Sequence, residues 1–170
     1  MKVDISSIRY TKGGSLQASV SKKFKPFEWA GEEILFQQPV TAELGFTNTG
    51  TLILAEGYIK AIIMVACSRC LEPFNLDLQA PFRIGYVGDP IKDLDLAEED
   101  MEIRAFKGKV IDVAPDVEET ILLSLPMKFL CRNDCRGMCP QCGQNLNEAA
   151  CHCKEDYIDP RLATLRDFIK

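Results

Sequence analysis

Residues Val40–Val65 read VTAELGFTNTGTLILAEGYIKAIIMV, and their side-chain pattern is the clearest structural signal in the chain. Val40–Phe46 and Leu52–Val65 alternate β-branched and aromatic residues with other residues, as strands with one buried face do. Between them, Thr47–Thr51 contains Asn and Gly, which favour a turn. The segment therefore predicts a long antiparallel β-hairpin.

The regions that flank this hairpin predict further strands. Pro73–Tyr86 alternates apolar and polar residues over most of its length, which predicts a third strand. Val110–Ile111 predicts a short edge strand, and the turn signal Gly13–Gly14 predicts a hairpin at an edge of the sheet. We therefore expect a mainly antiparallel β body.

Two helices are expected after these strands. Pro115–Glu119 places a proline and acidic residues in the first turn of a medial helix, which Pro126 ends. Apolar residues at helical spacing predict that one face of this helix packs in the core: Val117, Ile121, Leu122 and Leu125. Asp159 and Pro160 suit the N-cap and first residue of a short C-terminal helix that packs back on the body or on the cysteine-rich region.

The expected fold class is α+β: a mainly antiparallel β body with a medial helix, then a C-terminal Cys-rich zinc-binding module and a short terminal helix. We place the domain boundary after Pro126, with the β-rich body in residues 1–126 and the module and terminal helix in residues 127–170. The boundary is placed there because six of the eight cysteines follow within Cys131–Cys153, in a composition typical of metal knuckles.

The overall composition is typical of a folded globular protein, with 46% hydrophobic and 26% charged residues. The longest apolar run, Ala61–Cys67, is far shorter than the ~20 residues that a membrane-spanning helix needs. Residues 1–7 also lack the apolar block of a signal peptide, so we expect a cytoplasmic protein without membrane association. Because cytosolic thiols stay reduced, the eight cysteines predict metal binding rather than disulfides.

The spacing of four cysteines predicts one compact zinc site. The pattern C-x2-C-x8-C-x-C is formed by Cys139, Cys142, Cys151 and Cys153. Four thiolates can surround one tetrahedral zinc ion, and Gly143 suits the left-handed residue that lets the first knuckle turn back. His152 is expected to be a bystander, because three adjacent residues seldom all reach one ion.

The remaining cysteines form two pairs, Cys67-x2-Cys70 and Cys131-x3-Cys135. Neither pair can complete a tetrahedron alone, so we expect the two pairs to meet and to connect the β body to the module through a second zinc site. The spacing leaves an alternative open, in which Cys135 replaces Cys151 or Cys153 in the first site. One or two zinc ions per chain are therefore expected.

No constellation typical of catalysis is found in the sequence. The chain has a single histidine, so few residues could serve as the base of a nucleophilic site, and it has no glycine loop of the kind that binds phosphates. A thiol redox enzyme is the alternative, but the Cys67–Cys70 pair follows a predicted hairpin rather than opening the helix of a βαβ unit. We therefore expect a non-enzymatic protein with no small-molecule substrate.

Charge is unevenly distributed about the net value of −5. Residues 1–27 contain six Lys or Arg against one Asp, and three of the lysines form a basic patch: Lys22, Lys23 and Lys25. Asp89–Glu102 contains seven acids against one Lys and is expected to be a solvated loop or a frayed helix. Because each ion held by four thiolates adds a local charge of about −2, any contact with nucleic acid is expected to be local.

Four segments, in this order along the chain, resemble one known family. They are Cys67-Ser-Arg-Cys70-Leu71, Ile121-Leu-Leu-Ser-Leu-Pro126, Leu130-Cys-Arg-Asn-Asp-Cys-Arg-Gly-Met-Cys-Pro-Gln-Cys-Gly-Gln-Asn-Leu-Asn147 and Asp159-Pro-Arg-Leu-Ala163. From about Thr41 onward the chain is similar to the YceD family, the large ribosomal RNA subunit accumulation proteins. The resemblance implies a non-enzymatic bacterial or plastid factor that supports the accumulation, synthesis, processing or assembly of the large-subunit (23S) ribosomal RNA. The family's cysteine positions correspond to all eight cysteines of this chain.

This resemblance implies ribosomal RNA or a large-subunit ribosomal protein as the partner. Arg69, Arg132 and Arg136 lie within the knuckles and are the candidates for phosphate contacts, unless they only offset the negative charge of the thiolate clusters. The main alternative is a protein-interaction adaptor in which the acidic segment Asp89–Glu102 binds a basic partner.

Overall fold

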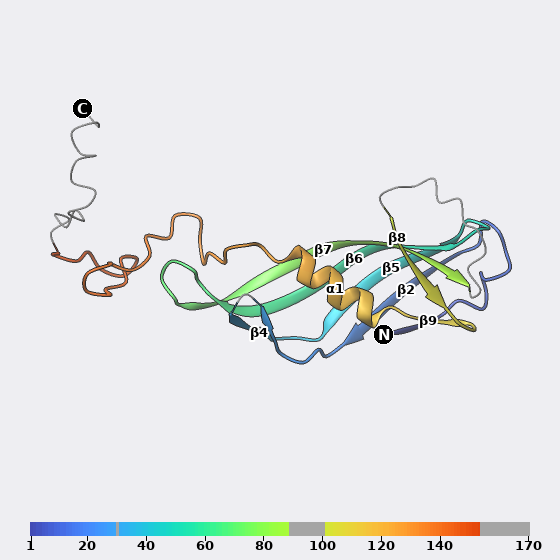
Figure 1. The fold of residues 1–170 in the computed structure, drawn as a ribbon, viewed down its shortest axis with the longest axis horizontal. Helices are drawn as coiled ribbons and strands as arrows, with labels where there is room; N and C mark the ends of the chain where they lie inside the picture. The colour runs from blue at the N-terminus through green and yellow to red at the C-terminus, as the bar shows by residue number, and fades with distance from the viewer. Residues whose placement is uncertain (30, 89–100, 154–170) are drawn as a thin grey trace, which may run out of the picture.

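The computed structural model describes residues 1–29, 31–88 and 101–153, and Figure 1 shows how its strands and helix are arranged. The elements are β1 (Lys2–Asp4), β2 (Ser15–Lys22), β3 (Phe27–Trp29), β4 (Glu32–Phe36), β5 (Val40–Asn48), β6 (Ile53–Ala66), β7 (Pro73–Gly88), β8 (Glu102–Phe106), β9 (Val110–Asp112) and α1 (Ala114–Ser124). Mostly antiparallel β structure with a single helix is therefore the architecture of the described part of the chain.

The predicted hairpin is confirmed as β5 and β6, which pair in antiparallel register up to Asn48 and Ile53. β7 is the predicted third strand and pairs antiparallel with β6 over the whole length of β6. β2 lies outside β5, while β4 pairs with the end of β6 that β5 does not reach, and β3 lies outside β4. The long strand β6 therefore organises the sheet.

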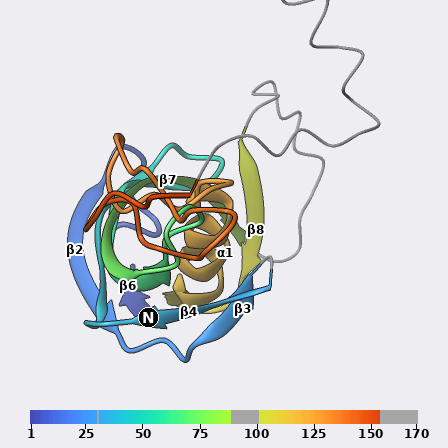
Figure 2. The same ribbon diagram turned by 90° about the vertical axis from the view of Figure 1, so that its left-hand side faces the viewer.

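The sheet curves around α1, as the view along the long axis shows (Figure 2). The predicted apolar face of α1 is confirmed, because Val117, Ile121 and Leu122 are buried or half-buried, as is Leu125 directly after the helix. They belong to one core with fully buried side chains of the strands, including Phe46 and Phe82. Burial of this apolar surface is the main force that holds the helix against the sheet.

One strand pairing differs from the sequence-based predictions, and another was not predicted. The turn at Gly13–Gly14 does not join a hairpin, because β1 pairs with β9 while β2 pairs with β5 as an edge strand. β8 pairs with β7 in parallel, so the sheet is not wholly antiparallel. The sheet is mainly antiparallel, as predicted, and only the hairpin prediction was wrong, because a turn signal does not identify the partner of the strand that follows it.

Two other predictions lie outside the described residues. These are the C-terminal helix that begins at Asp159 and most of the acidic segment Asp89–Glu102. In the parts of the chain that the structure describes, no helix combines the length and the apolar character that crossing a membrane requires.

Candidate metal centre

The eight cysteines gather into two groups of four. They come from the turn that joins β6 to β7 and from residues 131–153, two segments that lie at the same end of the structure (Figure 1). The first cluster is Cys67, Cys70, Cys131 and Cys135, and the second cluster is Cys139, Cys142, Cys151 and Cys153. Within each cluster all four Sγ atoms lie within 4.8 Å of one another. Each cluster can therefore hold one metal ion with four sulfur ligands, whereas His152 is exposed and belongs to neither cluster.

The first cluster is built on the tight turn between β6 and β7. The N–H of Leu71 donates to the carbonyl of Cys67 at 2.8 Å, and the N–H of Cys67 donates to the carbonyl of Glu72 at 2.9 Å. Leu71 has a φ of 60°, which lies in the left-handed region that favours glycine. This turn brings the sulfurs of Cys67 and Cys70 to the same side of the chain.

The second cluster repeats the same turn at equivalent positions. The N–H of Gly143 donates to the carbonyl of Cys139 at 2.9 Å, and the N–H of Cys139 donates to the carbonyl of Gln144 at 2.9 Å. Gly143 has a φ of 73°, so it adopts the left-handed conformation that its sequence predicted. The two knuckles differ mainly in the left-handed residue, which is leucine in one and glycine in the other.

Sulfur–sulfur distances in the first cluster fit a tetrahedral metal ion. The Sγ atoms of Cys67 and Cys135 lie 3.8 Å apart, and those of Cys70 and Cys131 lie 3.7 Å apart. Four thiolates at a Zn–S distance of ~2.3 Å form a tetrahedron with edges of ~3.8 Å, whereas a disulfide requires ~2.05 Å. All eight cysteines are free thiols, so the residues present fit a thiolate-bound ion rather than disulfides.

Backbone and side-chain hydrogen bonds clamp the first knuckle onto the segment that follows α1. The N–H of Ser68 donates to the carbonyl of Phe129 at 2.7 Å, and the N–H of Phe129 donates back to the Ser68 hydroxyl at 3.1 Å. The N–H of Met138 donates to the carbonyl of Arg69 at 3.1 Å. Gly137 allows the backbone before Met138 to lie this close to Arg69, because a Cβ at Gly137 would lie only 3.0 Å from the Arg69 carbonyl oxygen.

Asn147 connects the two clusters. Its side-chain nitrogen donates to Sγ of Cys135 at 3.3 Å, and its side-chain oxygen accepts from the N–H of Arg136 at 2.8 Å. Hydrogen bonds to ligating sulfurs orient the ligands and stabilise their negative charge. A residue between Cys142 and Cys151 in the sequence therefore supports a ligand of the first cluster.

The thiols within each cluster differ in pKa. Burial raises the pKa of the Cys67 thiol, but N–H groups of Cys131 and of its own turn donate to the sulfur and bring its pKa to about 6. Backbone N–H groups of its own turn lower the pKa of Cys139 to about 6. Burial raises the pKa of Cys131 to about 12, and a hydrogen bond with Cys142 raises that of Cys153 to about 12. Each cluster thus combines sulfurs that ionise easily with sulfurs that need a cation to ionise.

The structure places the three predicted arginines at the cluster end but in different surroundings. The guanidinium of Arg69 donates to the carbonyl of Cys135 at 2.9 Å, so it takes part in the clamp. Arg132 lies 3.6 Å from the Asp134 carboxylate, and both are exposed. The side chain of Arg136 is also exposed. Arg69 is exposed as well, so the three differ in what their side chains bind and not in exposure.

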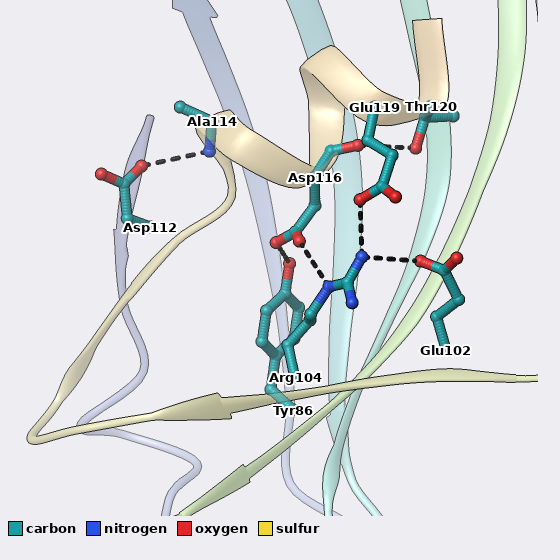
Figure 3. Close-up of polar contacts among 8 residues, drawn as sticks. All are labelled: Tyr86, Glu102, Arg104, Asp112, Ala114, Asp116, Glu119 and Thr120. Carbon is teal, nitrogen blue, oxygen red and sulfur yellow. Dashed lines mark hydrogen bonds and ion pairs between the residues drawn. The ribbon is translucent and has the colours of Figure 1, made fainter. Parts of the chain in front are cut away.

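A polar network between α1, β7 and β8 was not predicted from the sequence (Figure 3). The buried hydroxyl of Tyr86 on β7 donates to the carboxylate of Asp116 on α1, and Arg104 on β8 donates to the same carboxylate at 3.2 Å. Arg104 also contacts Glu102 and Glu119. The network ties α1 to the parallel strand pair, and burial and the adjacent carboxylate raise the pKa of Tyr86 above its usual range.

Sequence reasoning assigned Asp116 only to the first turn of a helix and missed this network. It also missed the structural roles of Leu71 and Asn147. In the sequence, the position of Leu71 directly after Cys70, equivalent to that of Gly143 after Cys142, was the available signal for its conformation. No signal identified the partners of Tyr86 or Asn147, since both contacts depend on the three-dimensional fold.

A family model described as large ribosomal RNA subunit accumulation protein YceD matches residues 55–169. The chain belongs to the YceD family. The matched range begins within β6, so it includes every cysteine of both clusters and the whole of α1. No solved structure matches this chain.

Several curated relatives resemble this YceD chain. An uncharacterised protein of Mycobacterium tuberculosis is 33% identical over 69% of this chain and 56% of its own length. The uncharacterised protein YlbN of Bacillus subtilis is 30% identical over 66% of this chain and 63% of its own length. A chloroplastic protein of Zea mays, named large ribosomal RNA subunit accumulation protein YCED homolog 1, is 24% identical over 68% of this chain and 49% of its own length. The chain thus spans about half to two thirds of the length of these relatives.

Proposed function

We propose that this protein is a non-enzymatic factor that supports accumulation of large-subunit ribosomal RNA by binding that RNA, with zinc in both cysteine clusters. The observation that carries the proposal is the match of residues 55–169 to a family whose description names this role. The maize relative that bears the same description supports it.

Zinc is the ion proposed because four cysteine sulfurs at tetrahedral spacing suit it best among the common cellular cations. In each cluster all four ligand positions come from the protein. A closed site of this kind leaves no open position for a substrate or a reactive water, which favours a structural role over catalysis. In this proposal zinc holds the region after α1 against the end of the β6–β7 hairpin.

Arginines on this rigid end are the proposed phosphate contacts. Arg132 and Arg136 project from a segment that two clusters and the Ser68–Phe129 clamp fix in place, so little side-chain and backbone freedom is lost on binding. Guanidinium groups form charge-assisted bonds with phosphate oxygens. Binding of this kind weakens steeply as salt rises, because it releases condensed counterions.

Sedimentation of a native lysate through a sucrose gradient at low and moderate salt tests the proposal. We expect the protein to migrate with precursors of the large subunit, to leave these fractions after RNase treatment, and to leave them in the Arg132→Ala/Arg136→Ala variant. A matched control is Lys60→Ala/Arg83→Ala, which removes two cations from exposed positions on β6 and β7. A wild-type position near the top of the gradient at every salt concentration would contradict the proposal.

The same experiment distinguishes the adaptor alternative, which is favoured by the excess of acids in Asp89–Glu102. In that alternative a basic ribosomal protein is the partner. Neutralising the acids would then abolish the association, while the arginine variant would migrate like the wild type.

Incubation of the purified protein with ribosomal RNA, with and without a chelator, adds a direct test of the non-enzymatic role, for which we expect no cleavage.

A further inference from the structure

A cavity of about 420 Å³ lies at the opposite end of the β body from the cysteine clusters. It opens between the segment after β1, the β5–β6 turn and the ends of β7 and β8. Its lining residues are Arg9, Tyr10, Lys12, Asn48, Gly50, Thr51, Leu52, Ile53, Tyr86, Gly88 and Phe106. The volume falls in the range of small-ligand pockets, ~300–1,000 Å³.

Hydrogen bonds from the buried side chain of Asn48 hold the walls of this cavity in place. Its nitrogen donates to the carbonyls of Ile8 and Arg9, each at 2.8 Å, and its oxygen accepts from the N–H of Gly50 at 2.8 Å. The backbone of Asn48 also bonds to Gly13 and Gly14 at 2.7 and 2.9 Å. The segment that carries Arg9 and Lys12 is therefore fixed to the β5–β6 turn before any ligand arrives.

Among the residues that the structure describes, the cavity is lined by two cations and by no carboxylate. The guanidinium carbon of Arg9 lies 5.3 Å from the ring centre of Tyr10 and 5.7 Å from that of Phe106, and Arg9 also donates to the carbonyl of Gly108. Arginine has five N–H donors, so this bond leaves donors for an anion. Lys12 is exposed at the rim beside Gly50.

Tyr10 provides an aromatic surface beside these cations. Tyr10 is 81% exposed, so its ring is accessible to a ligand. A positively charged groove with an accessible aromatic ring is the combination that binds single-stranded nucleic acids, through phosphate contacts and base stacking. A simple anion site would not need the ring, and an apolar ligand would not need the cations.

We propose that this cavity binds one nucleotide unit of single-stranded RNA, with its phosphate at Arg9 and Lys12 and its base stacked on Tyr10. The inference rests on the proposed function, because it takes RNA as the partner. It adds a second contact site far from Arg132 and Arg136, formed largely by residues that precede the range matched by the family model. Free mononucleotide or inorganic phosphate as the ligand is an outcome of the test.

The test measures binding of a short fluorescein-labelled oligouridylate by anisotropy, using the full chain loaded with zinc. Tyr10→Ala/Lys12→Ala is expected to lower the affinity about tenfold or more and to make the dependence of affinity on salt less steep. Tyr10→Phe/Lys12→Arg, which keeps the ring and the charge, should bind like the wild type. Thermal unfolding of each variant shows whether the fold is intact.

The chain contains a matched control for these substitutions. Tyr58 and Lys60 have the same spacing as Tyr10 and Lys12 and lie on β6, with Tyr58 54% exposed. Tyr58→Ala/Lys60→Ala should therefore leave the affinity unchanged. An equal loss in the control and the cavity variant would overturn the assignment of the cavity.

Two further outcomes separate this inference from the proposed function. Oligouridylate binding that survives Tyr10→Ala/Lys12→Ala but is lost in Arg132→Ala/Arg136→Ala would overturn the cavity site and leave the proposed function standing. Wild-type protein that binds no RNA and stays at the top of the gradient would overturn both. Competition by uridine monophosphate or phosphate as strong as that by the oligonucleotide would reject an RNA strand as the ligand.

Discussion

The side-chain nitrogen of Asn147 donates a hydrogen bond to Sγ of Cys135 across 3.3 Å. Asn147 belongs to the segment that joins the two halves of the second cluster, whereas Cys135 belongs to the first cluster. Together with the clamp around Ser68, this bond makes the two clusters one connected unit. A substitution in the segment around Asn147 should therefore weaken metal binding at the first cluster.

Asn147→Ala removes the donor to Cys135 and should weaken metal binding at the first cluster about 10–100-fold. Asn147→Asp should weaken it at least as much, because a carboxylate keeps the acceptor for the Arg136 N–H but repels the thiolates. Competition with a chromogenic chelator measures the affinity. The control is Asn133→Ala at an exposed position nearby. Unchanged affinity in both Asn147 variants would mean that the hydrogen bond does not support the cluster.

Leu71→Gly should stabilise the metal-loaded protein by about 1 kcal/mol, because leucine at a φ of 60° carries left-handed strain that glycine avoids. Leu71 is 61% exposed, so the change removes little packing. Urea unfolding at saturating zinc measures the free energy of unfolding.

Gly143→Ala tests the same reasoning in the second knuckle and should destabilise by about 1 kcal/mol. A Cβ at Gly143 would meet no atom within 4 Å, so the cost would come from the backbone conformation and not from a clash. Gly88→Ala is the control, because its added Cβ also meets no atom and its φ is not left-handed; it should change stability little. Leu71→Gly should raise the free energy of unfolding and Gly143→Ala should lower it. Changes in the same direction would contradict the assignment of left-handed strain to Leu71.

Removal of metal by a chelator should loosen residues 130–153 and leave the β body folded, because the core of Phe46, Phe82 and α1 does not depend on the clusters. Hydrogen exchange followed by mass spectrometry should show faster exchange in the knuckles and unchanged protection in β5–β7. Global loss of protection would show that the clusters stabilise the whole protein.

Single substitutions separate the two clusters. Cys142→Ser should remove the ion of the second cluster and leave that of the first, because Cys142 contributes only to the second cluster. Cys70→Ser should have the converse effect. Elemental analysis after anaerobic purification measures the number of zinc ions per chain. Wild-type protein with far less than one ion per chain would contradict the assignment of zinc to both clusters.

The periodicity of apolar side chains in the sequence predicted the strands and the helix that form from local sequence. Alternation identified β5, β6 and β7, and helical spacing identified the inner face of α1. The pairing of β1 with β9 and the parallel pairing of β8 were missed, since they depend on which distant segments the core brings together. At the clusters, spacing indicated which cysteines form pairs but left the partner of Cys135 open. The fold decides this, because the clamp around Ser68 brings Cys131 and Cys135 to Cys67 and Cys70.

Tyr86→Phe should destabilise the protein at neutral pH by about 1–3 kcal/mol, because it removes a buried hydrogen bond to the Asp116 carboxylate. The pKa of Tyr86 is raised by burial, by this bond and by the negative charge of Asp116. Folding therefore favours the neutral phenol, while an unfolded tyrosine ionises near pH ~10. The stabilisation from Tyr86 is thus fully present below about pH 10 and is lost as pH rises above that value.

Urea unfolding of zinc-saturated protein between about pH 7 and pH 11 should consequently show a steeper alkaline loss of stability in the wild type than in Tyr86→Phe. Lysines that lose their charge in the same range are common to both proteins, so the difference between the two curves isolates Tyr86. Tyr58→Phe is the matched control, since the ring of Tyr58 is exposed and loss of its hydroxyl should leave the stability at neutral pH unchanged. Parallel curves for the wild type and Tyr86→Phe would mean that the buried phenol does not control the alkaline limit of the fold, and the network around Asp116 would then owe its stability mainly to Arg104.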